Sequence, residues 1–197
     1  KIPCAKYRTT FIDGKIGVET DNFIGDCKSL VEFGELLTNE DLECLTDIEN
    51  EDFEAKFNYL CGKIKDKTGY DASDDIIRMM KIDIITMNAD RHYGNIGLII
   101  DEFDHSDVKF APLYDNGQCL LSEDIYLNTE AYGYDKFDLP GLSMFGMFPM
   151  KNYIKFVMKH SNKNNNIQVD LDKAEQVIDR EFIEKLLPLG VIVSNAG

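Results

Sequence analysis

The chain has 197 residues, of which 44% are hydrophobic and 29% charged, a composition typical of a soluble globular protein with one sizeable core. Its formal net charge of −15 disfavours direct binding to nucleic-acid phosphates and to anionic membrane surfaces. No apolar run reaches the roughly 18–20 residues of a membrane span, and no signal peptide is recognisable, so we predict a cytoplasmic protein.

The N-terminal third predicts a β-hairpin followed by helices. Residues 6–23 alternate apolar and polar side chains on either side of Asp13-Gly14, a favoured hairpin turn. Residues 29–37 have apolar side chains at helical spacing, which predicts a short helix. Residues 39–66 predict a longer helical region with one buried face.

A buried helix and a second hairpin are predicted in the middle of the chain. Residues 74–87 are apolar on nearly every side, which indicates a helix surrounded by the core, and Ser73 is its expected N-cap. The polar loop 88–95 interrupts the most hydrophobic part of the chain. Two short apolar runs then flank a polar turn at residues 104–107, which predicts a hairpin.

The C-terminal third is predicted to be mainly helical. Residues 138–141 predict a turn, residues 151–160 a helix, and residues 161–166 a polar loop rich in asparagine. Apolar spacing between Ala174 and Leu187 predicts a final helix.

The sequence contains one strongly acidic stretch. Eight carboxylates lie between Glu40 and Glu54 with no Lys or Arg among them, and we interpret them as a solvated helix face rather than a site for a basic partner.

The five cysteines are odd in number and show no C-x-x-C spacing. This pattern argues against a zinc site or a disulfide framework and favours scattered thiols in a reducing compartment.

Two polar segments carry the candidate chemistry. Asp90 and Asn95 lie on the loop 88–95, and Asp115 lies in the segment 111–117. Because the predicted hairpin joins the two segments, its ends bring Asn95 and Asp115 side by side, with Asp90 just before them. Two carboxylates and a carboxamide suit magnesium, which takes hard oxygen ligands together with substrate phosphates.

This set of groups matches the needs of phosphoryl transfer. One Asp accepts or orients the proton of the attacking hydroxyl, while an Asn and a second Asp hold the metal that neutralises charge on the phosphates. Either segment alone would read as ordinary turn residues. Their order, and the hairpin that joins them, favour a catalytic site.

The two segments resemble the catalytic core of the HipA-like serine/threonine kinases of bacteria. The motif D-R-H-x-x-N occupies residues 90–95, and the motif A-P-L-Y-D occupies residues 111–115. Members of that family have a D-x-H-x-x-N loop, a short hairpin and an A-P-x-[YF]-D metal segment. The resemblance runs from about residue 6 to residue 121, and it implies ATP and Mg²⁺ as cofactors and a protein serine or threonine as the substrate.

The resemblance also implies a role for each residue of the first motif. Asp90 is the expected catalytic base, and Asn95 and Asp115 are the expected magnesium ligands. His92 is a second candidate catalytic residue, although we favour packing and hydrogen bonding that fix the loop. Arg91 is expected to pair with a carboxylate of this acidic chain rather than to approach a phosphate.

Residues 6–24 resemble the hairpin and hinge that end the small lobe of such kinases. The candidate nucleotide-binding residues are therefore Asn22, Phe23 and Ile24. We accordingly divide the chain into residues 1–28, a hairpin and hinge remnant of the N-lobe, and residues 29–197, a HipA-like C-lobe.

The resemblance further implies a phosphate-covering loop and a strand lysine in the small lobe. Neither is recognisable before residue 6, Gly14 and Gly17 lie in the predicted hairpin, and Lys15 is not the expected lysine. We therefore expect the chain as printed to lack most of the N-lobe and to show little or no kinase activity alone. A missing N-lobe or an antitoxin-type partner would complete it.

The predicted fold class is α+β: a mainly helical, protein-kinase-like C-lobe with a catalytic β-hairpin and a small β remnant of the N-lobe. The predicted function is ATP- and magnesium-dependent phosphoryl transfer to a protein serine or threonine. One alternative is a catalytically silent, partner-binding module of the toxin–antitoxin type. Another is a lipid kinase, because the D-R-H-x-x-N string is also similar to phosphatidylinositol kinases, although the acidic charge disfavours docking on anionic membranes.

Overall fold

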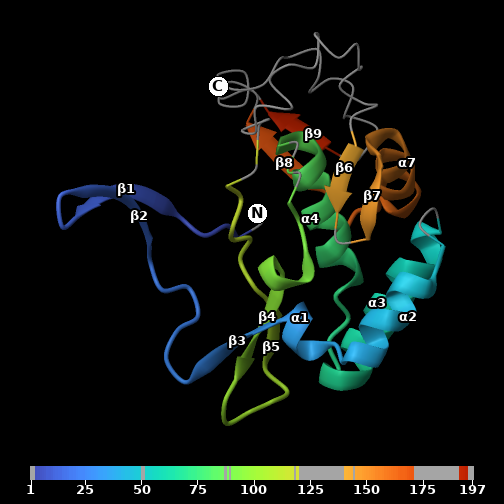
Figure 1. The fold of residues 1–197 in the computed structure, drawn as a ribbon, viewed down its shortest axis with the longest axis horizontal. Helices are drawn as coiled ribbons and strands as arrows, with labels where there is room; N and C mark the ends of the chain where they lie inside the picture. The colour runs from blue at the N-terminus through green and yellow to red at the C-terminus, as the bar shows by residue number, and fades with distance from the viewer. Residues whose placement is uncertain are drawn as a thin grey trace.

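The structure of the chain is a computed structural model. The residues that it describes are 3–49, 52–86, 88, 90–117, 119, 140–143, 145–170 and 191–194. They form a mixed α/β structure in which short sheets and helices gather in one body, and one β-hairpin projects from that body (Figure 1).

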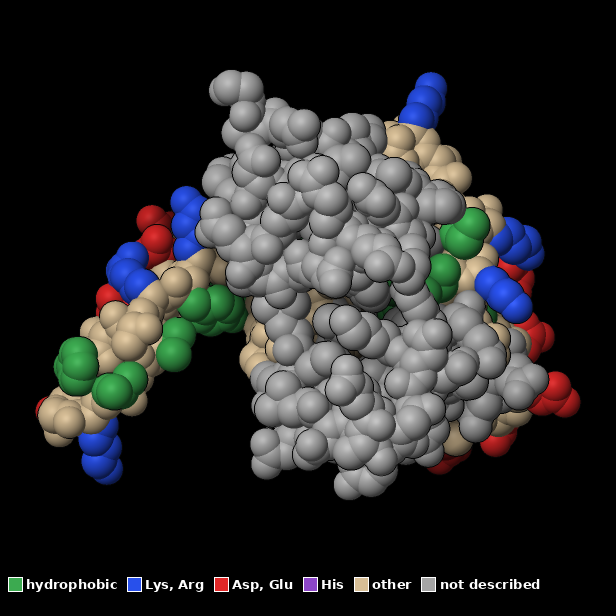
Figure 2. Space-filling view, turned by 90° about the horizontal axis from the view of Figure 1, so that it is seen from above, with side chains coloured by type: hydrophobic (Ala, Val, Ile, Leu, Met, Phe, Trp, Pro, Cys, Tyr) green, Lys and Arg blue, Asp and Glu red, His purple; other side chains and the backbone are tan. Residues whose placement is uncertain are grey.

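The projecting hairpin is the one that the sequence predicts. Strands β1 (Tyr7–Ile12) and β2 (Lys15–Thr20) pair antiparallel. The two turn residues, Asp13 and Gly14, both have positive φ angles, of 51° and 77°, which match the twist of the flanking strands. Figure 2 shows hydrophobic side chains along this ribbon.

A three-stranded sheet begins with the strand that follows the hairpin in the chain. It contains β3 (Lys28–Glu32), β4 (Gly97–Asp101) and β5 (Val108–Phe110), in the order β3-β4-β5, and β4 and β5 confirm the second predicted hairpin. Gly97 lies so close to β3 that a Cβ atom there would be 2.8 Å from the carbonyl oxygen of Val31. Only glycine permits this approach of the two strands.

The predicted helix at residues 29–37 is wrong over its first half. Residues 28–32 are strand β3, and helix α1 begins only at Phe33. Leu30 pairs with Ile99 of β4, so the strand gains a partner far away in the sequence. The spacing of apolar residues along one segment carries no information about a distant strand, and pairing with β4 overrides the local helical preference.

In the described residues before the loop 90–95, the helices are α1 (Phe33–Leu36), α2 (Asn39–Asp47), α3 (Phe53–Thr68) and α4 (Ser73–Thr86). The predicted helical region 39–66 is therefore two helices, and α3 ends at Gly69 with a φ of 73°. Ser73 is not the N-cap that the sequence predicts. It lies inside α4, and its backbone N–H and hydroxyl both donate to the carboxylate of Asp71.

The described residues of the C-terminal part form further short strands and a helix. They are β6 (Pro140–Ser143), β7 (Gly146–Pro149), α7 (Met150–His160), β8 (Ile167–Asp170) and β9 (Val191–Ser194). Helix α7 confirms the helix predicted at residues 151–160. The turn predicted at 138–141 is wrong where it can be seen, because residues 140–141 belong to β6, which pairs with β7. The predicted final helix, 174–187, lies outside the described residues.

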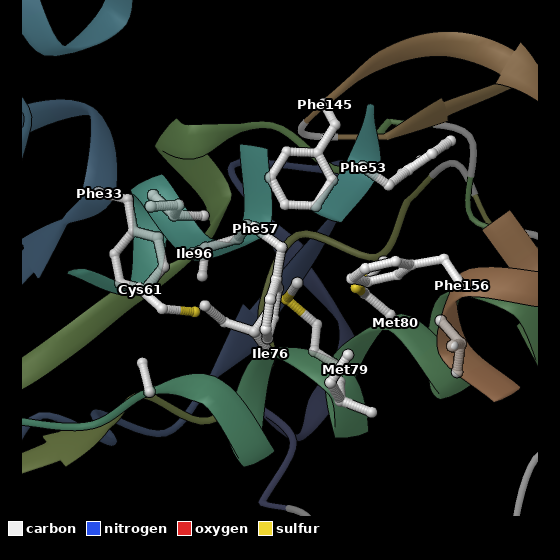
Figure 3. Packing of buried hydrophobic residues seen from close by; sticks show 14 of the residues in the cluster. Phe33, Phe53, Phe57, Cys61, Ile76, Met79, Met80, Ile96, Phe145 and Phe156 are labelled. Carbon is white, nitrogen blue, oxygen red and sulfur yellow. The ribbon is translucent and has the colours of Figure 1, made fainter. Parts of the chain in front are cut away.

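The core surrounds α4, as the apolar character of that helix predicts. Ile76, Met79 and Met80 are fully buried, and Figure 3 shows them facing aromatic rings of α3 and α7. The rings of Phe57 and Phe156 join α3 to α7, with centroids 5.3 Å apart. Burying each such side chain stabilises the fold by about 1.5–3 kcal/mol.

Helix α4 also buries a lysine, which docks the asparagine-rich loop. The Lys81 ammonium donates to the backbone carbonyl of Asn165 at 3.0 Å and to its side-chain oxygen at 2.7 Å. Burial lowers the pKa of Lys81 to about 8. The amide of Asn165 donates in turn to Asp74 and to the carbonyl of His160, so this polar loop is held firmly against α4.

The acidic stretch is mainly a solvated surface, as predicted, with one exception. Glu40, Glu43 and Asp47 are exposed. Asp41 is buried, and ion pairs to Lys63 at 2.8 Å and to Lys67 at 3.0 Å hold the pKa of its carboxyl well below the ordinary value. Lys63 and Lys67 of α3 therefore neutralise this buried carboxylate.

The predictions about disulfides and about membrane-spanning segments can be compared with the structure. The five cysteines all lie in the described part, and none is joined to another in a disulfide, as predicted. Among the helices described, none is both long and apolar enough to cross a membrane.

Candidate active site

The loop at residues 90–95 is closed by its own hydrogen bonds. The side-chain oxygen of Asn95 accepts the backbone N–H of His92 at 2.9 Å, and its amide nitrogen donates to the carbonyl of Asp90 at 2.7 Å. A single 3₁₀ turn, η1 (Tyr93–Asn95), ends the loop. Asn95 is only 2% exposed, so its amide fixes the shape of the loop from the inside.

Arg91 connects this loop to the second motif. Its guanidinium donates through one nitrogen to the carbonyl oxygens of Asn95 and Tyr114, each at 3.1 Å. Another nitrogen donates to the side-chain oxygen of Asn116 at 2.7 Å. The two motifs therefore lie within two hydrogen-bond lengths of each other, as the predicted hairpin requires.

The remaining face of the guanidinium is paired with Asp83 of α4. The Nη2–Oδ1 distance is 2.9 Å and the Nε–Oδ2 distance is 3.1 Å. Asn88 also donates to Asp83, at 3.0 Å. The expected pairing of Arg91 with a carboxylate is thus confirmed, and α4, the loop and the second motif share one side chain. An arginine suits this role because it offers five N–H donors in one plane.

This ion pair is buried, so both members depend on each other. Arg91 is 1% exposed and Asp83 is 3% exposed. Burial is the largest single influence and lowers the pKa of Arg91, but the charge and hydrogen bonds of Asp83, with smaller contributions from Tyr153 and Cys119, together raise that pKa above the ordinary value. Removing one member of a buried pair leaves the other charge without compensation, at a cost of about 3–5 kcal/mol.

The two predicted catalytic and metal-binding carboxylates are exposed. Asp90 precedes Arg91 directly, and within the described part of the chain its carboxylate has no hydrogen-bond or ion-pair partner. Asp115 lies between Tyr114 and Asn116, both of which bind Arg91. The structure therefore brings Asp90, Asn95 and Asp115 to one place, while their roles stay predictions.

Asp115 has an unusual backbone conformation. Its φ is 50°, in the left-handed region that non-glycine residues seldom adopt but that Asp tolerates better than most. Its backbone N–H donates to the hydroxyl of Tyr7 at 3.0 Å, a contact between residues 108 positions apart.

His92 is exposed and acts on the loop through its ring. Its Nδ1 accepts the backbone N–H of Gly94 at 3.0 Å, which matches the favoured loop-fixing role. A Cβ atom at Gly94 would lie 3.2 Å from the His92 ring, so glycine keeps this turn tight. A direct catalytic role of His92 stays a prediction.

The three candidate nucleotide-binding residues lie where β2 returns to the body. The side chain of Asn22 accepts the N–H of Ile24 at 3.0 Å, which turns the chain there. Phe23 stacks on Tyr114 of the second motif, with ring centroids 5.9 Å apart. Residues 22–24, the predicted hinge, therefore contact residues 111–117, the predicted metal segment, and nucleotide binding by residues 22–24 stays a prediction.

Sequence reasoning did not identify Asp83, Asn116 or Tyr7 as parts of the site. A signal existed for Asp83, because it is a carboxylate amid the buried apolar residues of α4 and needs a buried cation. Asn116 follows the motif directly and reads as a turn residue. No sequence signal could indicate Tyr7, since its contact joins distant parts of the chain.

The donor set fits a magnesium ion that also binds phosphates. Among the described residues, no three His, Cys, Asp or Glu side chains converge into a closed metal site. Magnesium in phosphotransfer sites uses one or two carboxylates and completes its shell with phosphates and water. Asp115 offers an exposed carboxylate with ligand capacity. Asn95 is 2% exposed, and among the described residues its side-chain oxygen accepts one hydrogen bond, from His92, so it would bind a metal only through the second lone pair of that oxygen.

Comparisons with known proteins address the fold. No protein-family model matches the chain, and no curated protein matches it. Among solved structures, it is similar to the crystal structure of a Helicobacter pylori proinflammatory kinase, CtkA, with a TM-score of 0.53 and 20% identity over 94% of this chain. The fold is kinase-like. The chain spans 66% of the length of that kinase, and at this identity the likeness concerns fold alone.

Proposed function

We propose that this chain is the catalytic lobe of a HipA-like kinase, which transfers a phosphoryl group from magnesium-bound ATP to a protein serine or threonine. The kinase-like fold supports phosphoryl transfer in general. The observation that carries the proposal is the contact of Arg91 with both motifs, because it holds the D-R-H-x-x-N loop against the A-P-L-Y-D segment.

Each side chain has a distinct part in this proposal. The exposed carboxylate of Asp90 is accessible to an acceptor hydroxyl and would orient it and take its proton. Asn95 and Asp115 would hold the magnesium ion, which when bound neutralises charge on the transferring phosphates. Arg91 is fully occupied by protein groups, so it positions the two motifs and does not reach the phosphates.

The nucleotide would lie against the hinge segment, near Asn22, Phe23 and Ile24. The proposal also requires a loop that covers the phosphates and a lysine that binds them, supplied by a small lobe or by a partner protein. Lys15 does not meet this requirement, because it is exposed on the projecting hairpin opposite Ile12.

The test compares three variants of the protein expressed from its complete reading frame. We expect Asp115→Asn to weaken binding of a magnesium–ATP analogue, because a metal ligand loses its charge. Asp90→Asn should spare that binding and lower the rate of transfer by about 10²–10⁴-fold, as expected for a positioned base. The matched control is Asp104→Asn, which changes an exposed carboxylate in the turn of the same hairpin.

Calorimetric titration and transfer of labelled phosphate to a generic protein acceptor measure the two effects. Unchanged nucleotide affinity in Asp115→Asn removes this residue from metal binding. Transfer by Asp90→Asn within about twofold of the parent removes Asp90 from the chemistry. The chain as printed, assayed beside the complete protein, should transfer little phosphate, because catalysis of this kind depends on positioning from both sides.

A second candidate function is a catalytically silent module that binds a protein partner. The hairpin favours it, because Phe11, Ile16 and Val18 are 66–74% exposed. The reading frame upstream distinguishes the two functions. A glycine-rich strand–loop–strand unit followed by a strand lysine supports the enzyme, and its absence, with no transfer by the complete protein, supports the silent module.

A further inference from the structure

The chain segments on either side of the β1–β2 hairpin both contact residues 113–114, which belong to the predicted metal segment 111–117. Before the hairpin, Ala5 donates its N–H to the carbonyl of Leu113 at 2.8 Å, and Leu113 donates to the carbonyl of Pro3 at 2.9 Å. After the hairpin, Phe23 stacks on Tyr114. Figure 1 shows the hairpin leaving the body beside this segment, which follows β5.

A further contact from the hairpin reaches Asp115 itself. The hydroxyl of Tyr7, the first residue of β1, accepts the backbone N–H of Asp115 at 3.0 Å. Tyr7 is 48% exposed, so its ring is only partly enclosed by the body. The hydroxyl thus reaches the one residue of the segment that is expected to bind the metal.

Asp115 needs external support for its conformation. Its φ of 50° is disfavoured for an L-residue with a side chain, and such conformations persist where surrounding contacts over-determine them. Three contacts do so here: Tyr114 and Asn116 are bonded to Arg91, and the N–H of Asp115 is bonded to Tyr7. The first two fix the neighbours, whereas Tyr7 is the described residue that binds the backbone N–H of Asp115 itself.

We propose that Tyr7 is a positioning residue, whose hydroxyl holds the backbone of Asp115 in the left-handed conformation from which its carboxylate binds magnesium. This inference rests on the proposed function, because it assigns Asp115 to the metal. It makes the root of the hairpin part of the site, although the hairpin itself projects away from the body. A displacement of β1 would then reach the metal ligand through one hydrogen bond.

Tyr7→Phe tests the inference in the protein expressed from its complete reading frame. The variant keeps the ring and removes only the acceptor oxygen. The matched control is Tyr59→Phe, which removes a phenol hydroxyl bonded to Asp41 on the far α2–α3 pair. Both variants remove a phenol hydroxyl that is bonded to a residue elsewhere in the sequence, and Tyr59 loses its contacts with Asp41, Cys44 and Lys63, but only Tyr7→Phe concerns residues 113–116.

Two measurements separate positioning from general stability. Hydrogen–deuterium exchange without nucleotide should accelerate at residues 113–116 in Tyr7→Phe and not in Tyr59→Phe. The magnesium concentration that half-saturates nucleotide binding should rise about fivefold, which corresponds to the loss of one hydrogen bond. At saturating magnesium, transfer should return to near the parent rate, because the base and the nucleotide contacts are intact.

Each other outcome overturns the inference. Unchanged exchange at residues 113–116, or an unchanged magnesium requirement in a parent that does bind, removes Tyr7 from positioning and leaves the proposed function standing. A lower melting temperature with equal loss at every magnesium concentration assigns Tyr7 to the fold alone. A parent that binds no magnesium–nucleotide overturns the proposed function, and the inference with it.

Discussion

The protein buries charge around Arg91 and exposes large apolar side chains on the β1–β2 hairpin. Arg91 and Asp83 are at most 3% exposed, whereas Phe11 and Ile16, which pair on one face of the ribbon, are 73% and 74% exposed. Proteins usually arrange these two classes of side chain the other way round. The two regions nevertheless meet, because the root of the hairpin contacts the segment that Arg91 holds.

The comparison shows two different uses of a costly arrangement. Every contact of the Arg91 network is satisfied within the chain, so the network sets a geometry and needs no partner. Within the described part of the chain, the large apolar side chains of the hairpin are mostly exposed, so burying them would need another surface. The first region therefore fixes a geometry, and the second would gain stability from association, as the second candidate function proposes.

The largest effect should come from breaking the buried pair. Arg91→Met leaves the Asp83 carboxylate buried without its cation, and we expect the free energy of unfolding to fall by about 3–5 kcal/mol. Urea denaturation measures it. The double variant Asp83→Leu, Arg91→Met should recover part of the loss, because it removes the uncompensated charge. A single-variant loss below about 1 kcal/mol contradicts the role of the pair.

A smaller effect should follow from another buried charge, Lys81. Burial lowers its pKa to about 8 in the folded protein, while the unfolded chain keeps the ordinary value near 10.4. Between these two values the unfolded state binds more protons, so the stability of the parent should rise with pH relative to Lys81→Met. The difference in unfolding free energy, measured from pH 7 to pH 10, checks this. If the unfolding free energy of the parent relative to Lys81→Met stays constant over this pH range, or falls as pH rises, the lysine titrates normally.

The smallest effect on stability should come from the hairpin. Phe11→Ser with Ile16→Ser changes two exposed side chains, so the free energy of unfolding should shift by no more than about 0.5 kcal/mol. Self-association should decrease at the same time, because the apolar face is lost. Thermal unfolding and light scattering measure the two properties. A strongly destabilised variant would show that the hairpin packs on the body after all.

The sequence was informative where local pattern decided the outcome. The turn at Asp13-Gly14 and the buried helix α4 follow directly from residue types and spacing. The approach of residue 95 to residue 114 follows from the hairpin between them, since antiparallel strands bring their ends together. For this reason, much of the candidate site could be placed before any coordinates were known.

Most of the errors and omissions concern partners distant in the sequence. Residues 29–32 are predicted as the start of a helix but belong to a strand that pairs with β4. The misplaced N-cap is a local exception, because Ser73 donates to Asp71 two residues before it. The ion pair of Asp83 required knowledge of which cation reaches the core. The contact of Tyr7 with Asp115 had no local signature at all.

The parallel bridge between Cys4 and Leu113 has a consequence for how the site becomes ordered. It closes a loop that includes the β1–β2 hairpin, the three-stranded sheet and helices α1 to α4, and closing so long a loop costs chain entropy. The bridge contains only a few backbone hydrogen bonds, which do not repay that cost by themselves. The contact of the N-terminal segment with residues 113–115 therefore depends on the elements between them being folded first, whereas the contacts of Arg91 with Tyr114 and Asn116 do not.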